Sequence, residues 1–220
     1  MHKNIKNLIY IQNEIKSKIF EYKIKDYNPN IIAISKTFKI DHILPLIKYG
    51  HIHFGENKIQ EAMDKWPEIK NENIQIKLHM VGKLQTNKVK FAIKIFDYIH
   101  SVDNIKLAKK ISDEQKKNNK KPKIFIQINI GNEPQKSGIS KGEIKFFYNY
   151  CKDLDLDVIG TMCLPPNDNK AEIYFSEMKK INQGLGLNEI SMGMSDDYLI
   201  ALKYHSTFLR IGSKIFGQRV

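Results

Sequence analysis

Residues 123–130 read KIFIQINI, which is the clearest strand pattern in the sequence. Isoleucine occupies every second position from Ile124 to Ile130, and a β-rich run of this length predicts a strand. Gly131 then begins a loop, and an amphipathic stretch near 141–152 predicts a helix. The rest of the chain repeats this unit of a short β-rich run and a longer amphipathic stretch.

Eight such units follow one another, after an N-terminal helix indicated by apolar residues at helical spacing from Ile5 to Ile19. We expect strands over 31–35, 52–55, 77–82, 98–102, 123–130, 157–162, 189–192 and 207–211. We expect helices near 41–49 (capped by Asp41), 57–66 (halted by Pro67), 85–95, 105–116, 141–152, 170–183 and 196–204, and a short one after Gly212. Each connection is long enough for a right-handed crossover, and eight β/α units close naturally into a barrel. We therefore predict an α/β fold, a (β/α)₈ TIM-type barrel, as a single domain over residues 1–220.

The alternative fold is an open, doubly wound parallel sheet. That fold favours a glycine-rich phosphate loop after its first strand. Here the first strand is followed by Ser35, Lys36, Thr37 and Phe38, without a glycine. The sequence favours the barrel.

The composition places the chain among ordinary globular proteins. Its 220 residues are 41% hydrophobic, which is enough for one sizeable core. No run of 18 apolar residues predicts a membrane span, and the polar start of the chain does not resemble a secretory signal. The two cysteines, Cys151 and Cys163, suggest no disulfide framework. We expect a cytoplasmic protein without membrane association.

The net charge of +12 raises the alternative of nucleic-acid binding. However, only two of the 36 cationic residues are arginines, the residue that reads bases and phosphates in pairs of hydrogen bonds. The densest lysine run, 116–121, falls where a helix ends and a loop begins. We therefore expect no nucleic-acid partner. In such a lysine-rich chain, Arg210 and Arg219 indicate positions that need a planar fork of donors.

Lys36 is the first candidate functional residue. It directly follows the apolar run from Ile31 to Ile34, so it stands at the C-terminal face of the barrel, where active sites of this fold lie. Partial burial there favours a neutral amine that can form a Schiff base. The alternative is a solvated lysine, which is the common case in this chain.

A second group of candidates follows the last two strands. Ser195 and Asp196 come after the seventh strand, and Gly212 and Ser213 come after the eighth. These loops form the usual phosphate site of the fold, although the same residues also suit ordinary turns, and Asp196 also suits a helix cap. A lysine facing a phosphate site fits a phosphorylated aldehyde held as an imine. Pyridoxal 5′-phosphate (PLP) and the substrate of a sugar-phosphate aldolase both fit.

Other candidate sites are weaker. His51 and His53 form an H-x-H pair, but no third ligand follows at a suitable spacing, so we expect no metal. Nothing beside Cys151 or Cys163 marks a reactive thiol. Trp66 is expected in the core.

Several motifs together resemble one known family, the YggS/PROSC family of PLP-binding proteins. They occur in order over nearly the whole chain: AISKT (33–37), FGEN (54–57), HMVGKLQTNK (79–88), HSVD (100–103), QIN (127–129), KSG (136–138), SMGMSD (191–196) and RIGSKIFGQR (210–219). Two departures occur, at Lys83, where the family usually has histidine, and at His205, where it usually has glycine. The family fold is a barrel like the N-terminal domain of alanine racemase.

The resemblance implies that PLP is held as an aldimine on Lys36. It places Ser195, Gly212 and Ser213 at the phosphate and Arg210 at the pyridine nitrogen, and it places Asn57 near the cofactor. The family is regarded as acting in PLP homeostasis without an established catalytic activity. We therefore expect no catalytic residue, a monomer, and PLP-dependent apoenzymes as recipients of the cofactor. The alternative is a working PLP enzyme such as an amino-acid racemase, which needs acid/base groups on both faces of the imine.

Overall fold

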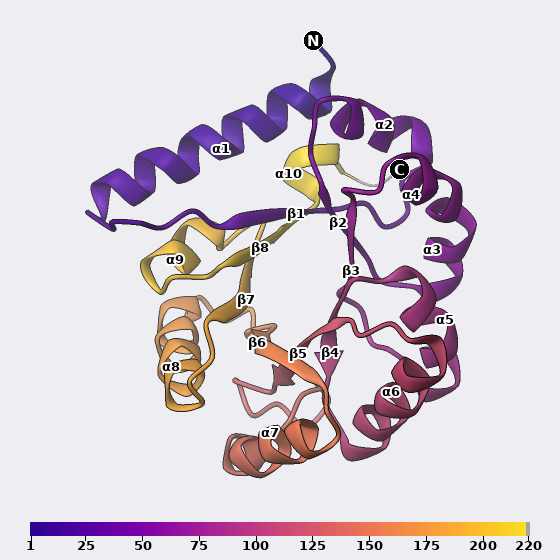
Figure 1. The fold of residues 1–220 in the computed structure, drawn as a ribbon. Helices are drawn as coiled ribbons and strands as arrows, with labels where there is room; N and C mark the ends of the chain where they lie inside the picture. Colours follow the sequence, from indigo (N-terminus) through magenta and orange to yellow (C-terminus); the bar gives the residue numbers. More distant parts are fainter. Residues whose placement is uncertain (219–220) are drawn as a thin grey trace.

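The computed structural model describes residues 1–218, and within them eight parallel strands form a closed barrel (Figure 1). The strands pair in chain order, and the last pairs with the first. They are β1 (Asn30–Ile34), β2 (His53–Glu56), β3 (Lys77–Met80), β4 (Tyr98–Val102), β5 (Lys123–Ile128), β6 (Asp157–Cys163), β7 (Glu189–Met194) and β8 (Phe208–Ile211). The predicted (β/α)₈ barrel is confirmed, and the open sheet is excluded.

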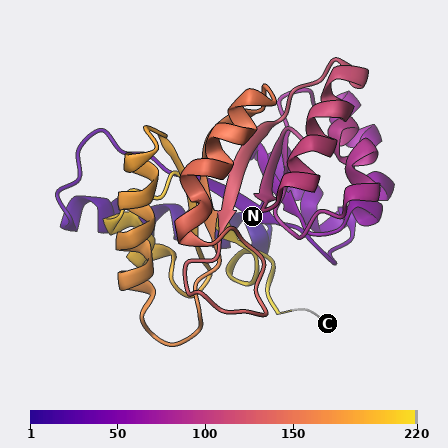
Figure 2. The same ribbon diagram turned by 90° about the horizontal axis from the view of Figure 1, so that it is seen from below.

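Helices alternate with the strands and surround the barrel (Figures 1 and 2). They are α1 (Lys3–Glu21), α2 (Ile40–Lys48), α3 (Ile59–Lys65), α4 (Pro67–Glu72), α5 (Val89–Ile95), α6 (Ile105–Asn118), α7 (Ile144–Asp153), α8 (Ala171–Gly184), α9 (Tyr198–Lys203) and α10 (Ser213–Phe216), with 3₁₀ turns η1 (Thr86–Lys88) before α5 and η2 (Lys141–Glu143) before α7. The additional helix α1 packs against α2, α9 and α10, where the first and last units meet. It buries Leu8, Ile11 and Ile15, as their helical spacing predicts.

Two expectations about helix ends need correction. Pro67 ends α3, but it also begins α4, because the first helical position needs no N–H group. Asp41 does not cap α2 but lies in its first turn, where a negative charge still suits the positive end of the helix.

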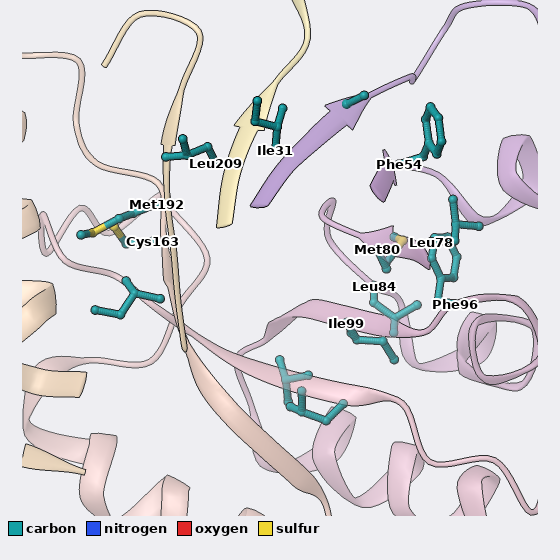
Figure 3. Packing of buried hydrophobic residues seen from close by; sticks show 14 of the residues in the cluster. Ile31, Phe54, Leu78, Met80, Leu84, Phe96, Ile99, Cys163, Met192 and Leu209 are labelled. Atoms are coloured by element: carbon teal, nitrogen blue, oxygen red, sulfur yellow. The ribbon is translucent and has the colours of Figure 1, made fainter. Parts of the chain in front are cut away.

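The main apolar layer lies between the strands and the surrounding helices. Ile31, Leu78, Ile99 and Leu209 belong to it, and their side chains are buried against the helical shell (Figure 3). Trp66 is fully buried in the same layer, as expected. This layer holds the helices on the barrel.

A second apolar cluster fills the inside of the barrel. It consists of Ile32, Ile34, Tyr98, Phe125, Met162 and Phe208. Along β1, Ile31 and Ala33 belong to the outer layer and Ile32 and Ile34 to the inner cluster, because successive strand residues face opposite sides. The same alternation directs Ser35 outward and Lys36 toward the mouth of the barrel.

Among the helices within residues 1–218, none has the length and apolar character that crossing a bilayer requires.

Candidate functional site

A cavity of about 670 Å³ lies at the C-terminal ends of the strands. The residues that the sequence singled out for cofactor binding all line it: Lys36, Asn57, Ser195, Arg210, Gly212 and Ser213. They come from the ends of β1, β2, β7 and β8, which are far apart in the sequence. Closure of the barrel therefore brings the predicted site residues together.

Lys36 enters the cavity from the end of β1. The side chain is partly buried, and Ile34 and Phe38 line the wall beside it. Ser35, whose side chain is fully buried, and Thr37 hold the main chain on either side through hydrogen bonds to neighbouring side chains. Thr37 has a φ of +70°, an uncommon left-handed conformation for a β-branched residue.

The loops after β7 and β8 form the opposite wall. Gly193 has a φ of +88°, and the pairing of β7 with β8 changes register between Ser191 and Met194. This irregularity redirects the chain so that Ser195 meets the other loop, where its Oγ accepts a hydrogen bond of 3.4 Å from the Gly212 N–H. Ser213 follows as the first residue of α10, whose first N–H groups have no acceptor within the helix.

The charges around the cavity favour an anionic ligand. Among residues 1–218, Lys36, Lys136 and Arg210 line it, against one carboxylate, that of Asp196. Asp196 does not cap α9, because Asp197 occupies the N-cap position and Tyr198 begins the helix. Asp197 instead accepts a hydrogen bond of 2.6 Å from the Met194 N–H, and burial raises the pKa of its carboxyl above the usual value. The wall thus combines a positive balance of charge with hydroxyl and amide donors, which suits a phosphoester.

Arg210 forms the floor of the cavity and is only 5% exposed. It donates through one terminal nitrogen to Ser191 Oγ at 2.6 Å and through the other to the Cys163 carbonyl at 2.8 Å. Burial lowers the pKa of the guanidinium from its very high usual value. A guanidinium carries five N–H donors, so one side of Arg210 can be anchored while another serves a ligand. The sequence predicted that this position needs a planar group with several donors, and the guanidinium of Arg210 bridges β6 and β7 in this way. Arg219 lies outside the described residues.

Below Arg210, three histidines cross the barrel interior, and we call His53, His79 and His100 the histidine array. His100 Nδ1 lies 2.9 Å from Ser191 Oγ, and its Nε2 lies 2.9 Å from His79 Nδ1. His79 Nε2 lies 2.9 Å from His53 Nδ1. The array therefore connects Arg210 with the N-terminal end of the barrel, where His53 begins β2.

The contact with Arg210 favours one direction for these hydrogen bonds. A guanidinium only donates, so Ser191 Oγ accepts from it, and the buried hydroxyl then donates its own hydrogen to its other partner, His100 Nδ1. His100 then donates from Nε2 to His79, and His79 donates from Nε2 to His53. In this arrangement each contact has one donor and one acceptor, and all three rings are neutral.

Burial keeps the histidine array neutral. His79 and His100 are fully buried, which lowers the pKa of each ring well below its usual value, and the positive charge of Arg210 adds to this effect at His100. Burial also lowers the pKa of His53 to about 4. Of the H-x-H pair in the sequence, His53 thus belongs to the histidine array, whereas His51 Nε2 lies 2.9 Å from the main-chain oxygen of His53. Groups of three or more potential ligand residues arranged for a metal ion do not occur in residues 1–218.

Asn57 lies at the rim of the cavity, where two loops touch. A Cβ atom on Gly82 would lie 2.3 Å from the carbonyl oxygen of Asn57 and 2.7 Å from its Cα. Only glycine allows the chain after β3 to approach so closely. Gly82 therefore fixes the position of Asn57.

Sequence reasoning missed two groups of residues around the site. Lys136, between β5 and α7, lines the cavity, pairs with Glu133 at 2.6 Å and donates to the Pro165 carbonyl. Lys65 and Glu56 lie behind Lys36 in a buried ion pair of 2.9 Å. The KSG motif (136–138) was the signal for Lys136, whereas nothing in the sequence distinguishes Lys65 from the other lysines of the chain.

The cysteines are unreactive, as the sequence indicated. Both are free and buried. Burial raises the pKa of Cys151 to about 12 and that of Cys163 to about 12. A thiol that stays protonated in this way is a poor nucleophile.

Comparison with known proteins agrees with this geometry. Residues 18–220 match the family described as alanine racemase, N-terminal domain. A pyridoxal phosphate homeostasis protein of Haemophilus influenzae is 35% identical over 97% of this chain and 94% of its own length. A protein of the same name from Aquifex aeolicus is 32% identical, with 86% of each chain covered.

Solved structures give the same result. PipY of Synechococcus elongatus PCC7942, solved with PLP bound, superposes with a TM-score of 0.81 at 27% identity, covering 92% of this chain and all of that one. Alanine racemase of Clostridium difficile has a TM-score of 0.74 at 15% identity. The match covers 99% of this chain and 57% of the racemase, and it shows a shared fold alone.

Proposed function

The chain belongs to the alanine racemase N-terminal domain family, and on that premise we propose that it binds PLP in the cavity at the barrel mouth and acts in PLP homeostasis. The observation that carries the proposal is the placement of Lys36 opposite Ser195, Gly212 and Ser213 in one positively charged cavity. Relatives named for PLP homeostasis, and PipY with PLP bound, support it.

Each group around the cavity suits one part of the cofactor. The amine of Lys36 would hold the aldehyde group of the cofactor, with which a neutral amine can form a covalent link. Ser195, Gly212 and Ser213 would supply hydroxyl and amide donors for the phosphate. Asn57 would lie beside the cofactor at the rim of the cavity.

Arg210 determines what the site favours chemically. It stays protonated and only donates, so it suits a ring nitrogen that accepts a hydrogen bond and carries no proton. PLP enzymes that need a strong electron sink place a carboxylate at this nitrogen instead. The floor of this cavity therefore favours retention of PLP over carbanion chemistry.

We also propose that the protein is not a racemase. Racemisation needs an acid/base group on each face of the imine. Among the described residues that line the cavity there is neither tyrosine nor histidine, and the titratable ones are Lys36, Lys136, Asp196 and Arg210. The solved alanine racemase, at 15% identity, shows a shared fold alone.

The experiment is a titration of the purified apoprotein with PLP, followed by visible absorbance and by a racemase assay. We expect a Schiff-base band at one equivalent and no interconversion of alanine or serine enantiomers. A protein that stays colourless in excess PLP would contradict the binding site. Turnover that Lys36→Ala abolishes while the fold is retained would contradict the non-catalytic role. A single domain, a monomer, apoenzyme recipients and a cytoplasmic location remain predictions.

A further inference from the structure

A buried ion cluster lies directly behind Lys36, on the outer face of the barrel. Glu56 ends β2 and is fully buried, and Lys65 ends α3. Lys65 Nζ contacts Glu56 Oε1 at 2.9 Å and Glu61 Oε1 at 2.8 Å. We call Glu56, Lys65 and Glu61 the ion cluster.

The ion cluster holds the residue before Lys36. Ser35 Oγ donates to Glu56 Oε1 at 2.8 Å, and Lys65 Nζ donates to the Ser35 carbonyl at 3.0 Å. Both the side chain and the main chain of Ser35 are therefore fixed. This contact follows from the strand alternation that directs Ser35 outward and Lys36 inward.

The ion cluster also holds the residue after Lys36. The Thr37 N–H donates to Glu61 Oε1 at 2.5 Å. Thr37 has its left-handed φ of +70° at this point, and such a backbone persists only where surrounding contacts hold it. The Glu61 carboxylate supplies that contact. Lys36 thus lies between two residues that the ion cluster holds.

The ion cluster is costly to bury. Glu56 Oε2 has no hydrogen-bond partner among the described residues, and burial raises the pKa of this carboxyl although Lys65 opposes the effect. A buried oxygen without a hydrogen-bond partner lowers the stability of the fold, so its presence calls for another role. The contacts to Ser35 and Thr37 supply such a role.

We propose that Glu56, Lys65 and Glu61 are positioning residues for Lys36, which fix the direction from which its amine meets an aldehyde in the cavity. The proposal rests on the function proposed above. Covalent bond formation depends steeply on alignment, and a misplacement of about 1 Å costs up to about 100-fold in rate. The ion cluster does not touch the aldehyde and acts only through the main chain at residues 35 and 37.

The test compares Glu61→Ala with Glu61→Gln. Glu61 is partly exposed, so both variants are expected to fold, and only glutamine keeps an oxygen that accepts from the Thr37 N–H. The control is Lys70→Met, because Lys70 likewise pairs with a carboxylate, Asp97 at 2.5 Å, and donates to a main-chain carbonyl, that of Ile95. It lies away from the residues that line the cavity.

Two rates are measured on each apoprotein: Schiff-base formation with excess PLP by stopped-flow absorbance, and acetylation of Lys36 by acetic anhydride, quantified by peptide mass spectrometry. We expect Glu61→Ala to slow Schiff-base formation about tenfold and to change the acetylation rate. Glu61→Gln should stay within about threefold of wild type, and Lys70→Met should lower the melting temperature while its rates stay within about twofold.

Equal rates in Glu61→Ala and wild type would overturn the proposal. Equal slowing in Glu61→Ala and Lys70→Met would also overturn it, because the cluster would then act through general stability. If the wild-type protein forms no link with PLP, the proposed function fails. The acetylation of Lys36 still decides whether the ion cluster controls its amine.

Discussion

The histidine array makes the fold sensitive to acid, and the size of the effect follows from burial. His79 and His100 are fully buried, and burial lowers the pKa of each ring well below its usual value. In the unfolded chain a histidine titrates at about 6.5. Below that pH the unfolded state binds protons that the folded state does not, so stability is full above pH 6.5 and falls as the pH falls.

The expected loss is a substantial fraction of the stability of a small protein. At pH 5 each neutral buried histidine costs about 2 kcal/mol relative to pH 7, so His79 and His100 together cost about 4 kcal/mol. A domain is typically stable by about 5–15 kcal/mol, so this loss is a substantial part of the total. The variant His79→Gln removes one of the two titrations and should halve this contribution.

The assay is urea denaturation of the apoprotein at pH 8, 7, 6 and 5, for wild type and His79→Gln. Other titrating groups are shared, so the difference between the two acid profiles isolates His79. We expect the free energies of unfolding to run parallel from pH 8 to 7 and to converge by about 2 kcal/mol between pH 7 and 5. Profiles that stay parallel down to pH 5 would refute the neutral array.

Three further substitutions test other parts of the structure. Gly82→Ala would place a Cβ 2.3 Å from the Asn57 carbonyl oxygen, so we expect the free energy of unfolding to fall by about 1–3 kcal/mol in thermal denaturation and PLP to be retained more weakly. An unchanged dissociation constant for PLP would contradict the role of Asn57. His205 has a φ of +60°, a conformation that glycine adopts at lower cost, so His205→Gly should stabilise the protein by about 0.5–1 kcal/mol in the same assay. Destabilisation would show that the side-chain contacts of His205 dominate. Arg210→Lys replaces the planar guanidinium by a single ammonium that cannot bridge Ser191 and the Cys163 carbonyl. We expect weaker PLP binding by equilibrium dialysis and a free energy of unfolding lower by about 1–3 kcal/mol. Wild-type values for both would argue against the need for a guanidinium here.

The barrel could be predicted because its signal is local. Residues Ile31 to Ile34 are all buried, alternately in the outer layer and in the inner cluster, so the strand appears in the sequence as an apolar run. Similar β-rich runs mark the other strands. The order of strands then follows from the connections, since β/α units close in chain order. Lys36 could be placed at the barrel mouth because this prediction depends only on its position in the sequence directly after a strand.

The supporting contacts could not be predicted, because they depend on pairing between strands. His53, His79 and His100 lie on three successive strands, and the sequence shows an H-x-H pair but not the alignment that brings the rings to hydrogen-bonding distance. Lys65 is one cation in a lysine-rich chain. Its role depends on the buried carboxylate of Glu56, which the sequence does not distinguish from an exposed one.

The most direct test of the account is the identity of the lysine that binds PLP. The protein is saturated with PLP, reduced with borohydride, digested, and mapped by mass spectrometry, with Lys36→Ala treated in parallel. We expect one labelled peptide, modified at Lys36, and no label at any other lysine of the site in Lys36→Ala. A label at Lys136 instead of Lys36, or a Schiff-base band that persists in Lys36→Ala, would contradict it.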